Sequence, residues 1–164
     1  MAIFTWHNGE IPEGVQITQV YGLIFSREGH LLLKAQPQIN NYGLAGGHPE
    51  PFDRGIEETL RRELIEEVNM TITKPLLVGY QLVDEEDGTP PFAQVRMTAL
   101  INTIGVNRPD TDNGKFYERL LTAPMKAAEL LNWGDVGYAQ IKAAIDIAAE
   151  SYGIADFNPN DKYI

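Results

Sequence analysis

Three glutamates, Glu63, Glu66 and Glu67, are spaced so that they could bind a cation together. On a helix that turns by about 100° per residue, they crowd one side of residues 54–68 near the C-terminal end. Like charges one turn apart repel, and carboxylates there oppose the helix dipole, at roughly 0.2–0.5 kcal/mol per pair. A bound Mg²⁺ would reverse that cost, because Mg²⁺ prefers oxygen ligands. The same spacing is typical of a solvated acidic helix face, so the glutamates alone leave both interpretations open.

The residues on either side of this helix favour a binding site. Gly46 and Gly47 follow a short apolar segment and provide backbone that can approach an anion closely. Asp53 stands where a helix N-cap is expected, so we predict a helix over residues 54–68. Asn69 follows, and asparagine is the second choice after glycine for the left-handed position that ends a helix. The loop and the helix together indicate a site for a metal and a phosphate.

The segment from Gly47 to Met70 resembles the Nudix box of the Nudix hydrolases. The family pattern is a glycine, five residues, a glutamate, seven residues, and then Arg-Glu-aliphatic-any-Glu-Glu-any-Gly-aliphatic. The core of its second half is matched in full, by Arg62, Glu63, Leu64, Glu66 and Glu67. Such a long box is a far more specific signal than a lone glycine motif.

The chain departs from this pattern at three points. Asp53 stands where the family has glutamate, and eight residues instead of seven separate Asp53 from Arg62. Asn69 replaces the last glycine, a mild change because asparagine tolerates the same backbone conformation. We expect the inserted residue at the helix start, around residues 54–55, where a glycine can absorb a bulge. These departures bear on whether Asp53 acts as a metal or salt-bridge partner.

The resemblance implies a divalent-metal site, with Mg²⁺ or Mn²⁺, that hydrolyses a diphosphate bond. The implied metal ligands are Glu63, Glu66, Glu67 and, at the start of a late strand, Glu118. The implied catalytic residues are Glu66, Glu67 and Arg62. Within this set, Arg62 is expected to orient a box glutamate by ion pairing, which is a structural role.

Two further residues are candidates for contact with the substrate, Gly47 through its backbone and Lys34 late in the second strand. Lys34 is slightly more typical of an exposed strand lysine, whereas Glu118 is equally typical of an ordinary strand-edge glutamate. The general base is open between Glu66, Glu118 and the acidic residues 84–86.

The predicted elements around this site are strands and helices in alternation. Strands are predicted over 15–26, 30–35, 42–45, 76–83, 92–103 and 116–122, and helices over 54–68, 124–132 and 136–151. This order indicates an α/β or α+β protein with helices on both faces of a sheet. The resemblance, which covers residues 15–151, implies an α/β/α sandwich with a mixed central sheet. We find no repeat and no linker, so residues 1–164 are expected to form a single domain.

Charge and composition restrict the class of partner. The net charge is −10, from 13 basic and 23 acidic residues, which disfavours nucleic-acid polymers and anionic membranes as partners. No apolar run is long enough to cross a bilayer, and the N-terminal residues lack the pattern of a secretory signal. The absence of cysteine fits the cytoplasm and rules out thiolate chemistry. The expected partner is a small nucleotide-type molecule, and the oligomeric state is open, a homodimer included.

Three functional hypotheses follow. The first is a metal-dependent hydrolase that cleaves the diphosphate bond of a nucleoside diphosphate linked to another moiety. The second is a catalytically silent Nudix-fold module that binds a nucleotide or effector. The third is an α/β protein whose acidic helix binds nothing. The complete set of Glu63, Glu66 and Glu67 favours the first over the second. The sequence does not identify the substrate, because the loops that would select it carry no readable pattern.

Overall fold

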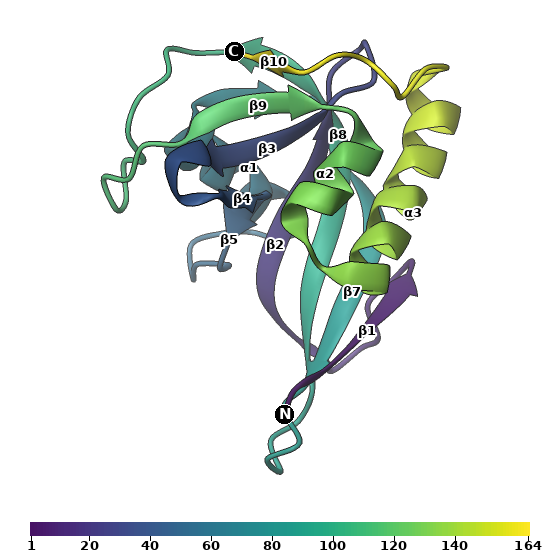
Figure 1. Cartoon of the computed structure of the whole chain (residues 1–164). Coiled ribbons are helices and arrows are strands. Elements are labelled where there is room, and N and C mark those ends of the chain that lie inside the picture. Colours follow the sequence, from purple (N-terminus) through teal and green to yellow (C-terminus); the bar gives the residue numbers. More distant parts are fainter.

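A mixed β-sheet runs through the molecule, and the computed structural model describes all 164 residues around it (Figure 1). Its strand order is β1 (Ile3–Asn8), β7 (Leu76–Asp84), β8 (Phe92–Ile104), β2 (Gln16–Phe25), β3 (Leu31–Gln36), β9 (Glu118–Thr122) and β10 (Lys162–Tyr163). Strands β2 and β8 are parallel and the other pairs are antiparallel. The predicted α+β class with a mixed central sheet is therefore confirmed.

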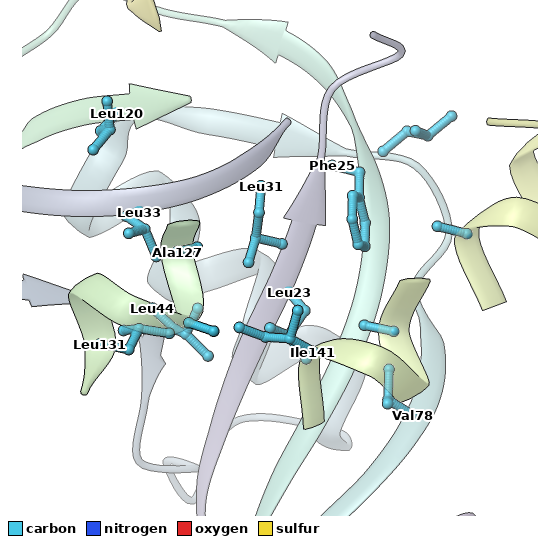
Figure 2. Close-up of a cluster of buried hydrophobic side chains, with 14 of the residues drawn as sticks. Leu23, Phe25, Leu31, Leu33, Leu44, Val78, Leu120, Ala127, Leu131 and Ile141 are labelled. Atoms are coloured by element: carbon cyan, nitrogen blue, oxygen red, sulfur yellow. The ribbon is translucent and has the colours of Figure 1, made fainter. Parts of the chain in front are cut away.

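Helices cover both faces of this sheet. Helix α1 (Ile56–Val68) packs on one face, whereas α2 (Pro124–Leu131) and α3 (Gly134–Tyr152) pack on the other (Figure 1). Side chains alternate between the faces along each strand, so Leu23 joins the core under α2 and α3 and Ile24 joins the core under α1. Figure 2 shows the first of these cores, where Leu23 lies beside Ile141 of α3 and Leu31 belongs to the same cluster.

The sheet opens between β2 and β3. These strands share only the pair Phe25 and Leu31 and then diverge. Two short strands fill the opening: β4 (Asn41–Gly43) pairs with β3, and β5 (Ala45–Gly47) pairs with β2. This arrangement brings the glycine loop beside α1, because β5 lies between β2 and the helix that follows it in the chain.

The structure corrects the predicted start of the helix. Helix α1 begins at Ile56 with Gly55 as its N-cap, so Asp53 is not the cap. The carboxylate of Asp53 is already engaged, since it accepts hydrogen bonds from the Glu50 N–H and from Arg62. The inserted residue thus lies before the helix rather than in it. At the other end, Asn69 has φ of 51°, which confirms the predicted left-handed termination.

The single strand predicted over 42–45 is found as two, β4 and β5, and three further strands lie wholly outside the predicted ones. They are β1, β6 (Met70–Ile72) and β10. Strand β1 is mostly exposed, and its alternation of apolar and polar residues covers only Phe4 to His7, whereas β6 and β10 are too short to show a period. None of the three helices combines the length and apolar character needed to span a membrane.

Candidate metal and catalytic site

Glu67 anchors the site at the junction of α1 and β5. Its carboxylate is buried, accepts a hydrogen bond of 2.7 Å from the Gly46 N–H, and forms an ion pair with Lys34. Gly46 has φ of +152°, and a Cβ there would overlap the carbonyl oxygen of Val20. Only glycine allows the backbone to lie this close to β2 and still aim its N–H at the helix.

Glu63 lies against the second glycine of the loop. A Cβ on Gly47 would lie 2.5 Å from one Glu63 carboxylate oxygen and 2.6 Å from its carboxyl carbon. The missing side chain of Gly47 therefore creates the space that the Glu63 carboxylate fills. Gly47 is predicted as a backbone contact for phosphate. In the structure, its lack of a side chain gives the Glu63 carboxylate room beside the loop.

Arg62 connects the acidic residues of the helix to the loop before it. Its guanidinium donates hydrogen bonds to Asp53 at 2.9 Å and to Glu63 at 3.0 Å, and it forms an ion pair with Glu66 at 3.3 Å. It also donates to the carbonyl of His48. The ion pairing expected of Arg62 is thus present, and it fixes the positions of two helix glutamates.

Asp53 keeps its salt-bridge role despite the insertion. Its side chain is 1% exposed and accepts hydrogen bonds from Arg62 and from the Thr59 hydroxyl. The bonds from the Arg62 guanidinium hold the pKa of the Asp53 carboxyl well below its usual range. Because Asp53 points at Arg62, it is a structural partner of the acidic helix and does not line the space in front of the glutamates.

The glutamates of α1 are in surroundings that oppose their negative charge. Burial raises the pKa of the Glu63 carboxyl, and the nearby Glu67 raises it further. Burial likewise raises the pKa of Glu67, against the opposing effect of Lys34. A cation between these groups would relieve both effects, because it would neutralise carboxylates that water reaches poorly.

Asp110 is a site residue that the sequence did not indicate. It is 4% exposed, and its charge contributes to the raised pKa of Glu67. The loop that carries it docks on the C-terminal end of α1, where the Thr111 N–H donates to the carbonyl of Glu66 and the Arg108 side chain donates to that of Ile65. Helix C-terminal carbonyls lack partners within the helix, so they attract such donors. No feature of the sequence linked this loop to the helix.

A polar recess of about 380 Å³ lies in front of these residues. We call it the carboxylate recess, and its acidic lining consists of Glu50, Glu63, Glu66, Glu67, Asp110 and Asp112. Arg62 lines it too, whereas Lys34 contacts it only through Glu67.

Glu118 lies away from this recess. Along β9, Leu121 belongs to the core under α1 and Leu120 to the core under α2 and α3. By alternation, Glu118 shares the face of Leu120, which is opposite to α1. The structure therefore does not bring Glu118 together with the helix glutamates. The acidic turn that begins at Asp84 is also remote, since residues 85–91 are exposed and none lines the recess.

The donor set suits a hard divalent cation. The recess offers six carboxylates and one imidazole, that of His48, whose Nδ1 is hydrogen-bonded to the Thr18 carbonyl, and oxygen-rich sets of this kind are what Mg²⁺ and Mn²⁺ prefer. No three of these groups converge on one point in the arrangement observed. Arg62 holds Glu63 and Glu66, and Lys34 holds Glu67, so the protein's own cations occupy the carboxylates. The residues fit the metal, and binding requires these ion pairs to rearrange.

Comparison with known proteins identifies the family and the fold. The NUDIX domain family model matches residues 16–132, which is most of the chain. No curated protein matches the sequence. Among solved structures, a variant of the pyrophosphohydrolase BsRppH from Bacillus subtilis has a TM-score of 0.61 at 16% identity, covering 87% of this chain and 90% of its own.

Two further structures show the same fold. MutT from Bacillus halodurans has a TM-score of 0.56 at 18% identity, covering 74% of this chain and 78% of its own. The NUDIX domain of NrtR from Shewanella oneidensis, solved with ADP ribose, has a TM-score of 0.54 at 18% identity, covering 80% of this chain and 88% of its own. The family match over residues 16–132 and the acidic helix beside the glycine loop lead to one conclusion: this chain belongs to the NUDIX domain family.

Proposed function

We propose that the protein is a Mg²⁺- or Mn²⁺-dependent hydrolase that cleaves the diphosphate bond of a nucleoside diphosphate linked to another moiety. The observation that carries the proposal is the carboxylate recess, in which three glutamates of one helix and Asp110 from a distant loop face a common space. Two cations of the protein, Arg62 and Lys34, face these four carboxylates, so the recess keeps an excess of negative charge that a divalent cation would neutralise.

Different residues of the chain would bind the metal and position its ligands. Glu63, Glu66 and Glu67 would hold the metal, which supplies charge neutralisation on the phosphoryl oxygens and lowers the pKa of water. Gly46 and Gly47 place two of these carboxylates, through a hydrogen bond and through the space left by a missing side chain.

Glu66 is the best-placed general base. Its side chain is 27% exposed, compared with 14% for Glu63 and 6% for Glu67, so water reaches it most readily. Arg62 orients Glu66 by its ion pair and Asp53 orients Arg62, which makes both positioning residues. The intact link between Asp53 and Arg62 also favours an enzyme over a silent binding module, since the altered first half of the box still supports the acidic helix.

The decisive experiment is a screen of diphosphate compounds with Mg²⁺ or Mn²⁺, run on the wild type and on Glu67→Gln. We expect Glu67→Gln to lose at least about two orders of magnitude of whatever hydrolysis the wild type shows. Glu58→Gln is the matched control, because Glu58 lies on the same helix and contacts only the exposed Arg54. Equal rates in the wild type and Glu67→Gln would refute the assignment.

The proposed substrate is a small nucleotide-type molecule rather than a nucleic acid or a membrane. We continue to predict a location in the cytoplasm and a single domain over residues 1–164. The oligomeric state is open, and a homodimer is one of the alternatives. Size-exclusion chromatography with light scattering measures the oligomeric state directly.

A further inference from the structure

A second cavity, of about 670 Å³, adjoins the site. We call it the arginine cavity. Phe4, Tyr21, Leu44 and Trp133 contribute its apolar walls, and Gln94 and Arg96 contribute polar groups. Lys34 lines this cavity and also pairs with Glu67 of the carboxylate recess, so it marks the boundary between the two spaces.

Arg96 is buried in this cavity wall without a counter-ion. The residue is 2% exposed, and no Asp or Glu side chain forms a salt bridge with it. Only Nε is hydrogen-bonded, to the Gln140 side-chain oxygen at 2.8 Å, while Nη1 is buried with no partner. The rings of Tyr21 and Trp133 lie 5.0 and 5.4 Å from the guanidinium carbon and stabilise the charge only in part. An arginine in this state is costly to the fold.

The other buried arginine of the sheet, Arg119, shows that a guanidinium can be buried in this fold without a buried, unpaired donor atom. Arg119 is 4% exposed and forms no salt bridge with an Asp or Glu side chain. Its guanidinium donates to the main-chain oxygens of Ile164, Val68 and Gly105, at 3.0, 2.9 and 2.9 Å. The fold therefore can satisfy a buried guanidinium with backbone oxygens. At Arg96 it supplies only one oxygen, which leaves the remaining donors for a ligand.

A chain of glutamine side chains fixes the direction of these donors. Arginine cannot accept a hydrogen bond, so Gln140 must offer its oxygen to Nε of Arg96. The Gln140 amide nitrogen then donates to Gln81, and the Gln81 nitrogen donates to Gln94 at 2.8 Å. The chain ends at the amide nitrogen of Gln94, which is another donor at the cavity. The polar groups thus present an excess of donors, and they are complementary to a ligand rich in acceptors.

We propose that the arginine cavity binds an oxyanion, a phosphate or a carboxylate, at the end of the substrate that is remote from the scissile diphosphate. This inference rests on the proposed function, which places the diphosphate at the carboxylate recess. Arg96 holds two oxygens of the group through its planar fork, and the organic part of the substrate lies against Tyr21 and Trp133. The cavity is much larger than a free phosphate ion, so the oxyanion belongs to a larger molecule.

The test uses small compounds that lack a diphosphate, so that it does not depend on hydrolysis. Benzoate, phenyl phosphate and the neutral benzamide are titrated into the wild-type protein with EDTA present. Binding is followed by the NMR signal of the Trp133 indole N–H, which a Trp6→Phe variant distinguishes from that of the other tryptophan. We expect at least one oxyanion to shift the Trp133 signal, with at least about tenfold tighter binding than benzamide.

The two oxyanions distinguish the source of the charge. Tighter binding of phenyl phosphate assigns a phosphate to the cavity, and tighter binding of benzoate assigns a carboxylate. Arg96→Met keeps the length of the side chain and should weaken the oxyanion at least about tenfold while leaving benzamide unchanged. The proposal is overturned if benzamide binds as well as the oxyanions, if neither oxyanion moves the Trp133 signal, or if Arg96→Met retains full affinity.

Glu67→Gln separates this inference from the proposed function. Glu67 contacts Lys34 but does not line the arginine cavity. Oxyanion binding that persists in Glu67→Gln while hydrolysis is lost supports both assignments. Oxyanion binding in a protein that hydrolyses no diphosphate would support the cavity and refute the enzyme.

Discussion

Gly47→Ala tests whether the missing side chain of the loop sets the position of a metal ligand. The added Cβ would lie 2.5 Å from one oxygen of Glu63, and ordinary contact begins at 3.4 Å, so the carboxylate must move by about 1 Å. The carboxylate ends a flexible side chain, and a rotated side chain costs about 1 kcal/mol. The protein should therefore fold with little loss of stability, measured by thermal unfolding.

The effect on function should be much larger. A displacement of about 1 Å in a reacting or ligating group costs about 100-fold in rate. We expect Gly47→Ala to lose about that factor in kcat/KM and to require more Mg²⁺ for half-maximal hydrolysis. The assay is a Mg²⁺ titration of hydrolysis for the wild type and the variant.

Gly46→Ala provides the contrast at the neighbouring position. There the added Cβ would overlap the backbone carbonyl of Val20, and φ is +152°, so nothing flexible can yield. This variant should lose roughly 3 kcal/mol of stability from overpacking and backbone strain. If Gly47→Ala keeps the wild-type Mg²⁺ dependence and rate, then the missing side chain of Gly47 does not set the position of Glu63 as a metal ligand.

Further predictions concern charges that the fold holds. Asp53→Ala should reduce the free energy of unfolding by about 3 kcal/mol, because it leaves Arg62 without its most buried partner; an unchanged denaturation midpoint would contradict this. Arg96→Met should leave the ligand-free protein at least as stable as the wild type, whereas Arg119→Met should lose about 2 kcal/mol with its three bonds to main-chain oxygens, and urea denaturation compares the two. The pKa of Asp161 is lowered: its partial burial acts to raise it, but bonds from lysine and threonine side chains outweigh that. Asp161 therefore contributes about 0.5 kcal/mol to the free energy of unfolding at pH values above the ordinary pKa of an aspartate, and this contribution is lost as the pH falls through the pKa of Asp161 in the folded protein. In Asp161→Asn, the free energy of unfolding should depend less on pH in that acidic range, which urea denaturation at several pH values would measure.

The sequence was informative where a pattern is local. The residues that flank the acidic segment predicted a helix over 54–68, and α1 is found two residues shorter than predicted at its start. Asn69 ends the helix as expected, because the preference for a left-handed terminus lies in the residue itself. The predicted cap at Asp53 failed because the ion pair with Arg62 competes for its carboxylate.

Residues that act over long separations were not accessible in this way. Asp110 reaches the site because its loop satisfies the last carbonyls of α1, 43 residues away in one such contact. Arg96 carries no motif, and only the structure shows that its Nη1 is unpaired and that the residue lines a cavity. The face on which Glu118 lies depends on strand register, which a difference of one residue reverses.

The three glutamates on one helix were determined by the sequence alone, since helix geometry fixes which side chains share a side. The tertiary structure decided what surrounds them. The divergence of β2 and β3 admits the glycine loop, Gly46 and Gly47 position two carboxylates, and a distant loop adds Asp110. The physical reason is that burial, charge and unpaired donors depend on neighbours in space, and those are set only when the helices and loops pack on the sheet.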